Sequence, residues 1–355
     1  MKEKILEFFE NTDAEAVLLR NSDSAPDANF YYYSGLESGH YYGSSLILKK
    51  GKKPLLLTNA LYSTNVKDMR AKKVSSEKNL KKILQKEFAG IKKIGLNFDS
   101  YPKNSFSRIK KLLPEKKFED VSKALAKTRE TKTGEEIAKM RKAIKISESA
   151  IKQLPNFFKK GITEKQLAMK LEWLLREEGD SELAFPTIVA SGKNSSTPHY
   201  FTGNAKIKSG FLLVDFGAKY KNYCSDLTRM FSIGKATQAQ KEIYGKIFEA
   251  KQLAKKMCVP GTNRKEIFDK TDSFIKKNTG FKMIHGLGHG LGLEAHDFPY
   301  GFSGKSSDLL KQGMVLTLEP AIYTKKFGIR IEDDVLITKN GSELLSSAPE
   351  ELIEL

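Results

Sequence analysis

Two apolar stretches that are each interrupted by acidic residues constrain the fold of this chain more than any other feature. Residues 210–232 read GFLLVDFGAKYKNYCSDLTRMFS, and residues 315–337 read VLTLEPAIYTKKFGIRIEDDVLI. Aspartate is depleted in β-strands, and an unpaired buried charge is costly. If the two stretches are buried β-hairpins, their acids therefore need a specific partner.

The register of each hairpin predicts which acids meet. Turns at Tyr220-Lys221 and at Lys325-Lys326 would place Asp215 opposite Asp226, and Glu319 opposite Glu332. Directly opposed side chains have β-carbons about 5 Å apart, so both carboxylate pairs would repel strongly. Two divalent cations ~3.5–4 Å apart would neutralise four carboxylates that lie this close together. Structural salt bridges to lysine or arginine are the alternative interpretation.

Histidines gather in the same part of the sequence. Four of the five lie between positions 199 and 296, and three of them, His285, His289 and His296, share the stretch HGLGHGLGLEAHD. The alternating glycines permit close backbone approach and leave the imidazoles unshielded. An imidazole ligand beside carboxylates suits Mn, Co, Fe or Zn better than Mg or Ca. The sequence has no H-E-x-x-H, G-x-S-x-G, G-x-G-x-x-G or paired C-x-x-C motif.

Composition excludes several other classes of protein. The net charge of +18 comes from 52 lysines and only 9 arginines, whereas base and phosphate recognition favours the guanidinium, so we expect a solvated surface and no nucleic-acid partner. No apolar stretch approaches the ~20 residues of a membrane helix, and the N-terminus lacks the pattern of a signal peptide. Two cysteines, Cys224 and Cys258, fit a reducing compartment. We therefore expect a cytoplasmic protein that does not bind membranes.

The local patterns predict mixed helix and strand structure on both sides of a polar segment, Ala124–Thr133. Before it we expect strands at Ala16–Arg20, Phe30–Ser34, Ser45–Lys49, Pro54–Thr58 and Lys93–Leu96, and helices at Lys2–Glu10, Glu77–Phe88 and Ser105–Leu113. After it, capping-box patterns at Thr133 and Thr163 open helices that extend to about Leu154 and Leu175, and two more helices are expected at about 239–257 and 264–277.

The C-terminal ~220 residues resemble the pita-bread metallopeptidases (family M24), in the branch that contains aminopeptidase P and prolidase. The matching stretches are FPTIVASGKNSSTPHYF, LLVDFGAKYKNYCSDLTR, HGLGHGLGLEAHD, GMVLTLEPAIY and GIRIEDDVLI. The first ~125 residues resemble the creatinase-type domain of the same branch. The resemblance implies an α+β protein: a smaller α/β domain at 1–125, and a pita-bread catalytic domain at 126–355.

The resemblance also implies roles for individual residues. The five metal ligands would be Asp215, Asp226, His289, Glu319 and Glu332, with Asp226 and Glu332 bridging two ions, Asp215 completing one ion, and His289 and Glu319 completing the other. Glu319 would shuttle protons, His199 and His296 would act on the substrate, and His285 would line its pocket. Arg330 would hold the acids in place. The implied enzyme is a homodimer that uses two divalent ions, Mn or Co first and Zn or Fe as alternatives.

The activity implied by the resemblance is hydrolysis of the Xaa-Pro bond at the N-terminus of peptides or dipeptides, by a metal-activated hydroxide. Two departures from the family pattern bear on the substrate. Asp297 follows His296 where the family commonly has glutamate, and Asp297–Tyr300 has no arginine where prolidases often have one that holds the dipeptide's carboxylate. The alternative is a non-catalytic homologue that binds peptide or RNA, but such relatives tend to lose ligands and this chain has kept all five.

Overall fold

The computed structural model describes residues 2–177 and 181–355, which form two compact units, Met1–Arg129 and Glu130–Leu355. The helices of the N-terminal unit are α1 (Lys2–Glu10), α2 (Ala28–Ser34), α3 (Glu77–Glu87), α4 (Lys103–Leu112) and α5 (Ser122–Lys127). Its strands are β1 (Ala16–Arg20), β2 (Ser45–Lys49), β3 (Leu55–Thr58), β4 (Arg70–Lys73), β5 (Lys93–Leu96) and β6 (Lys117–Asp120).

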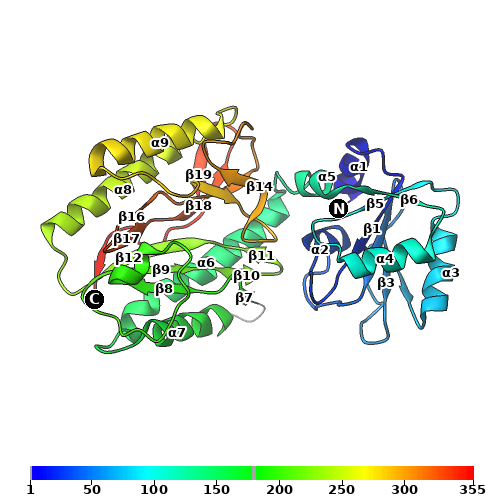
Figure 1. The fold of residues 1–355 in the computed structure, drawn as a ribbon, viewed down its shortest axis with the longest axis horizontal. Coiled ribbons are helices and arrows are strands. Elements are labelled where there is room, and N and C mark those ends of the chain that lie inside the picture. The colour runs from blue at the N-terminus through cyan, green and yellow to red at the C-terminus, as the bar shows by residue number, and fades with distance from the viewer. Residues whose placement is uncertain (1, 178–180) are drawn as a thin grey trace. The chain divides into compact units, whose positions relative to one another are not determined.

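The N-terminal unit is a six-stranded mixed sheet covered by helices on both faces (Figure 1). The strand order is β4-β3-β2-β1-β5-β6, with β1 antiparallel to β2 and parallel to β5. Alternate residues of β1 enter different cores: Val17 packs with α1 and α2, and Leu18 packs with α3 and α4. Two buried faces explain why β1 is apolar without alternation.

The strand expected at Phe30–Ser34 is wrong, because these residues belong to helix α2. The Asp27 side chain caps its start by accepting a hydrogen bond from the backbone N–H of Asn29 (2.9 Å), and Gly35 ends it at a φ of 67°. Aromatic residues favour strands, but these caps and the burial of Phe30 and Tyr33, three positions apart on one helix face, decide the structure.

The C-terminal unit contains the remaining elements. Its helices are α6 (Gly134–Phe157), α7 (Glu164–Glu177), α8 (Gln238–Met257) and α9 (Arg264–Thr279), with a 3₁₀ turn at Gly192–Ser196. Its strands are β7 (Ser181–Leu183), β8 (Ile188–Ser191), β9 (Gly210–Phe216), β10 (Ala218–Tyr220), β11 (Tyr223–Cys224), β12 (Leu227–Ile233), β13 (Gly288–Gly290), β14 (Asp297–Phe302), β15 (Val315–Leu318), β16 (Ala321–Tyr323), β17 (Gly328–Arg330), β18 (Asp333–Ile337), β19 (Ser342–Leu344) and β20 (Ile353–Glu354).

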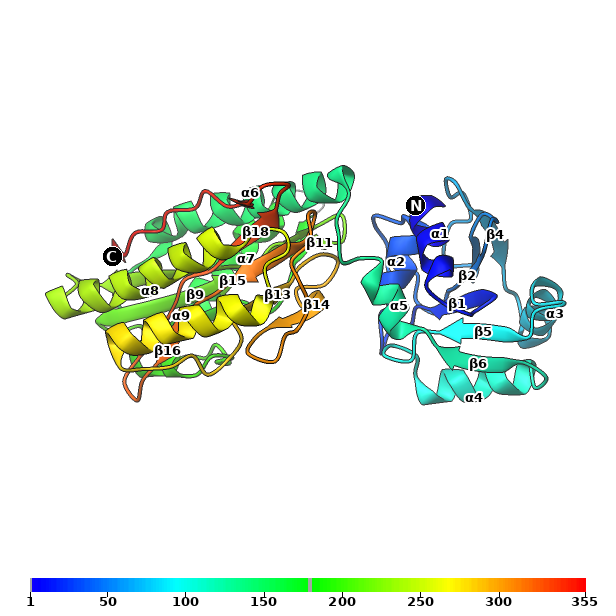
Figure 2. The same ribbon diagram turned by 90° about the horizontal axis from the view of Figure 1, so that it is seen from above.

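Strands of this unit lie between two helical pairs. Helices α8 and α9 run side by side and pack on the face of β9 that carries Phe211 and Leu213 (Figure 2). Helices α6 and α7 pack on the opposite face, which carries Leu212 and Val214. Asp215 shares the face of Leu213 because side chains alternate along a strand, so it points into the interior between the sheets. No helix among the described residues combines the length and hydrophobicity needed to cross a bilayer.

The first predicted hairpin register is wrong by two residues. The turn falls at Lys221-Asn222, both at positive φ, and β9 pairs with β12 so that Asp215 faces Thr228 rather than Asp226. A shift of two preserves the face on which each side chain lies, so Asp215 and Asp226 still point the same way. The predicted proximity of the two acids therefore does not depend on the exact turn.

The second predicted register is confirmed. Strand β15 pairs with β18 so that Leu318 faces Asp333, and β16 pairs with β17 so that Ala321 faces Arg330. Glu319 and Glu332 occupy matching positions between these two ladders.

Candidate metal centre

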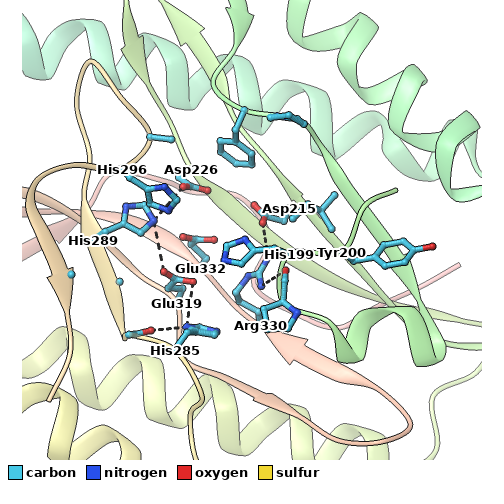
Figure 3. Close-up of a pocket in the computed structure, with 18 of the residues that line it drawn as sticks. His199, Tyr200, Asp215, Asp226, His285, His289, His296, Glu319, Arg330 and Glu332 are labelled. Carbon is cyan, nitrogen blue, oxygen red and sulfur yellow. Dashed lines mark hydrogen bonds and ion pairs between the residues drawn. The ribbon is translucent and has the colours of Figure 1, made fainter. Parts of the chain in front are cut away.

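The nine residues singled out in the sequence line a single cavity of about 630 Å³ in the C-terminal unit (Figure 3). They are His199, Asp215, Asp226, His285, His289, His296, Glu319, Arg330 and Glu332. Five different segments supply the four acids and His289: strand β9, the residue before β12, strand β13, the residue after β15, and the residue before β18. The predicted gathering of these side chains is therefore observed, whereas their individual roles remain predictions.

Glycines allow the segment of His289 to approach β15 closely. A β-carbon at Gly288 would lie 2.0 Å from the carbonyl oxygen of Thr317, and one at Gly290 would lie 2.6 Å from the carbonyl oxygen of Asp297. Only glycine fits at such separations. The expectation that the alternating glycines permit close backbone approach is confirmed.

The hydrogen bonds of His289 define which ring nitrogen faces the acids. Its Nδ1 lies 3.2 Å from the carbonyl oxygen of Gly290, which can only accept, so Nδ1 carries the proton. Its Nε2 then presents a lone pair 3.7 Å from both Asp226 Oδ2 and Glu319 Oε1. Burial, and then the charge of His296, lower the pKa of His289 to about 3, which keeps the ring neutral. A neutral imidazole with this orientation is the form that binds a metal.

The carboxylates are crowded and buried. Ligand atoms of Asp226, His289 and Glu332 lie within 4.8 Å of one another. Burial, and then the charge of Glu332, raise the pKa of both Asp226 and Glu319 well above the ordinary value. Burial and the charge of Asp215 raise the pKa of Glu332 to about 7. The shifts follow from the burial of carboxylates close to one another, an arrangement that a positive charge between them would stabilise.

Arg330 supplies part of the positive charge that neutralises the carboxylates. It forms a buried ion pair with Asp215 (Nη2 to Oδ2, 2.5 Å) and donates from Nε to Thr228 Oγ1 (3.0 Å). The other oxygen of Asp215, Oδ1, is buried without a hydrogen-bond partner. No lysine is among the described residues that line the cavity. The alternative of simple salt bridges thus accounts for one oxygen of one acid, and the remaining oxygens with the His289 lone pair fit a divalent cation.

Thr228 supports the cluster, although no sequence motif pointed to it. Its hydroxyl donates to Glu332 Oε2 (2.6 Å), and its backbone pairs with Glu332 in an isolated bridge that joins two sheets. Arg229, its neighbour, donates to the carbonyl oxygen of Glu332 and to Asp333 Oδ1 (2.6 Å each). The available signal is the period of two along a strand, which places Thr228 on the same face as Asp226.

Tyr323, which no motif indicated either, links His285 to Arg330. The Tyr323 hydroxyl accepts a hydrogen bond from Arg330 Nη1 (2.7 Å) and lies 3.0 Å from His285 Nε2. His285 Nδ1 lies 2.7 Å from the carbonyl oxygen of Gly286, so this nitrogen carries the proton and Tyr323 donates to Nε2. Both nitrogens of His285 are thus engaged within the protein, whereas His199 and His296 are exposed to the cavity.

The carboxylate of Asp297 binds backbone N–H groups and not the candidate metal centre. The residue is buried, and its carboxylate accepts hydrogen bonds from the backbone N–H groups of Leu293 (3.1 Å) and Phe298 (2.7 Å). It therefore shapes the turn between His289 and β14, and it is absent from the described lining of the cavity.

Comparison with known proteins agrees with this arrangement. The model of metallopeptidase family M24 matches residues 138–339, and that of the creatinase/prolidase N-terminal domain matches residues 2–131. The chain is 35% identical to a protein of Pyrococcus horikoshii named Xaa-Pro dipeptidase, over 99% of this chain and 97% of the relative. The crystal structure of an X-Pro aminopeptidase from Thermotoga maritima superposes with a TM-score of 0.90 at 32% identity, covering 98% of this chain and 99% of that one.

A prolidase structure from Pyrococcus horikoshii gives a TM-score of 0.88 at 33% identity, with 99% of each chain covered. The Pyrococcus horikoshii relative and both solved structures therefore match this chain along nearly its whole length, the creatinase-type N-terminal domain and the pita-bread domain included. On these grounds the protein is a member of metallopeptidase family M24.

Proposed function

We propose that the protein is a metal-dependent exopeptidase that hydrolyses the Xaa-Pro bond at the N-terminus of peptides or dipeptides. The observation that carries the proposal is the convergence of four carboxylates and the Nε2 lone pair of His289 in a cavity whose exposed side contains His199 and His296. Similar proteins named Xaa-Pro dipeptidase and X-Pro aminopeptidase support the choice of bond.

We assign the ligands as the family resemblance implies. Asp226 and Glu332 would each be a ligand of both divalent ions, Asp215 would complete the ligands of one ion, and His289 and Glu319 would complete those of the other. Divalent ions held by these residues would supply a water of lowered pKa and would polarise the peptide carbonyl. Mixed imidazole and carboxylate donors favour Mn or Co, with Zn or Fe as alternatives.

The protein's own side chains orient the ligands and move protons. We assign the transfer of protons to Glu319, a carboxylate that lines the cavity 3.7 Å from His289 Nε2. His199 or His296 stabilises the developing oxyanion or protonates the leaving nitrogen. The nitrogen of an Xaa-Pro bond leaves as a secondary amine and needs this proton on a defined face.

The test is hydrolysis of a short Xaa-Pro-Yaa peptide and an Xaa-Pro dipeptide by Mn-loaded protein. We expect chelation to abolish cleavage and added Mn or Co to restore it. Asp226→Ala and Glu332→Ala should each lower kcat/KM by more than about 100-fold, since each removes a ligand. Asp269→Ala is the control, because Asp269 is an exposed acid on α9 that pairs with Lys265.

Cleavage at the original rate after verified metal removal, or full activity of both ligand variants, would contradict the two-metal assignment. No cleavage of any Xaa-Pro peptide by the metal-loaded protein would favour a peptide- or RNA-binding homologue instead.

We further propose a cytoplasmic homodimer with domains at 1–125 and 126–355. Two buried free cysteines, Cys224 and Cys258, support a reducing compartment. The family resemblance supports the dimer. Light scattering of the purified protein checks the assembly, and expression of residues 126–355 alone checks the boundary.

A further inference from the structure

Two exposed aromatic side chains line the cavity that holds the candidate metal centre. Phe201 is 90% exposed and Tyr300 is 55% exposed, and they come from the segment after His199 and from strand β14. Single exposed apolar side chains are ordinary on a protein surface. Here both rings belong to the lining of the cavity that contains the candidate metal centre, and ligand sites are typically lined by aromatic side chains.

The backbone that carries Phe201 is anchored on both sides. On one side, Tyr200 donates a hydrogen bond to the buried carboxylate of Glu164 (2.9 Å), and Figure 3 shows the Tyr200 ring directed away from the carboxylate cluster. On the other side, the Thr202 hydroxyl donates to the carbonyl oxygen of Thr187 (3.0 Å) and accepts from the N–H of Val189 (2.9 Å). The backbone at Phe201 is therefore held in place by its neighbours, while the Phe201 side chain itself is exposed.

Glu164 ties this segment to the body of the domain. Its carboxylate also accepts hydrogen bonds from the Ser191 N–H (2.7 Å), the Ser191 hydroxyl (2.9 Å) and the Asn194 amide (3.0 Å). An apolar side chain held in place before binding costs little entropy when a ligand covers it. The arrangement suits Phe201 to binding rather than to a place in the core.

The charges of the cavity indicate what the aromatic rings would contact. Arg330 is the one lysine or arginine among the described lining residues, and it donates to Asp215, Tyr323, Thr228 and the carbonyl oxygen of Pro198. Among the described lining residues, no further lysine or arginine is present to hold the terminal carboxylate of a dipeptide. A peptide that continues beyond proline places a neutral amide there instead.

We propose that Phe201 and Tyr300 form a subsite for the side chain that follows proline, so that the preferred substrates are Xaa-Pro-Yaa peptides in which Yaa is apolar. This inference rests on the proposed function. Because Phe201 lies two positions after His199, which we assign to the substrate, we place the side chain that follows proline beside its ring. Apolar contact with the two rings selects Leu or Phe over Gly at that position.

The experiment compares Xaa-Pro-Leu with Xaa-Pro-Gly, using Mn-loaded wild-type protein, Phe201→Ala and Tyr300→Ala. We expect the wild type to favour the leucine peptide in kcat/KM by about four- to fifteenfold, the effect of burying one or two methylenes. Each aromatic variant should bring the ratio close to one. Met169→Ala is the matched control, because Met169 is 58% exposed on α7 and outside the cavity lining, and it should keep the wild-type ratio.

Calorimetric binding of the same two peptides to metal-free protein separates the subsite from catalysis. A binding preference for the leucine peptide that Phe201→Ala removes supports the subsite even if no peptide is cleaved, an outcome that would reject only the proposed function. Equal binding of both peptides by the wild type, or an unchanged preference in Phe201→Ala and Tyr300→Ala, overturns the subsite even if Xaa-Pro hydrolysis is fast.

Discussion

Replacement of Thr228 by valine tests how the bridge between the two sheets supports the metal centre. The substitution keeps the shape of a fully buried side chain and removes its hydroxyl, which donates to Glu332 Oε2 (2.6 Å) and accepts from Arg330 Nε (3.0 Å). Hydrogen bonds to charged groups contribute about 1.5–3 kcal/mol each. Loss of a group that orients a ligand lowers metal affinity by about 10–100-fold, or about 1.4–2.7 kcal/mol, which falls in the same range.

The assay is calorimetric titration of metal-free protein with Mn, followed by Xaa-Pro-Yaa hydrolysis at saturating metal. We expect Thr228→Val to bind Mn about 10–100-fold more weakly and to recover part of its activity at high Mn. Thr228→Ser keeps the hydroxyl and loses one methyl group, so it should bind Mn like the wild type. Wild-type Mn affinity in Thr228→Val, with an unchanged fold by circular dichroism, would refute the idea that this hydroxyl orients Glu332.

Two further changes test packing and charge elsewhere. Gly288→Ala should destabilise the protein by about 1–3 kcal/mol and weaken Mn binding, because the new methyl group would lie 2.0 Å from the carbonyl oxygen of Thr317. Gly341→Ala, whose new methyl group meets no atom within 4 Å, is the control in the same urea unfolding measurement. Equal free energies of unfolding for the two variants would contradict the steric argument. Burial of Glu87 opposes ionisation, but hydrogen bonds from Lys49 and Lys72 and the charge of Arg70 lower its pKa from 4.5 to about 2. Its contribution is therefore complete above pH 4.5 and is lost as the pH falls towards 2, so Glu87→Gln should cost about 1–2 kcal/mol at pH 7 and little at pH 2. A constant difference between the two proteins across this range in acid unfolding would show that the charge of Glu87 is not the cause.

The strands that carry the acids of the C-terminal unit could be predicted, because these acids interrupt two otherwise apolar stretches. Glu319 and Glu332 were paired correctly, since the Lys325-Lys326 turn is bounded by a regular ladder. The pairing of Asp215 with Asp226 was wrong because Lys221 and Asn222 both adopt positive φ, a conformation that no pattern of hydrophobicity reports. The acids still met, because the error of two residues preserves the strand face.

Contacts between distant segments were beyond local patterns. The helix at Ala28–Ser34 reads as a strand because its aromatic side chains favour strands, whereas its caps depend on the geometry of Asp27 and Gly35. Strands β4 and β6, which read RAKK and KFED, carry too few apolar residues to be recognised. The links from Tyr323 to His285 and from Thr228 to Glu332 join different strands, and only the fold brings those strands together.

The Thr228–Glu332 bridge also bears on when the enzyme becomes competent. These two residues are 104 positions apart in the chain, with Asp215 and Asp226 on the early side. During synthesis the early acids leave the ribosome well before Glu319 and Glu332, and domains fold as units. A partly synthesised chain therefore holds an incomplete set of ligands. It cannot hydrolyse peptides, including other chains nearby, until the hairpin at residues 315–337 has emerged and docked.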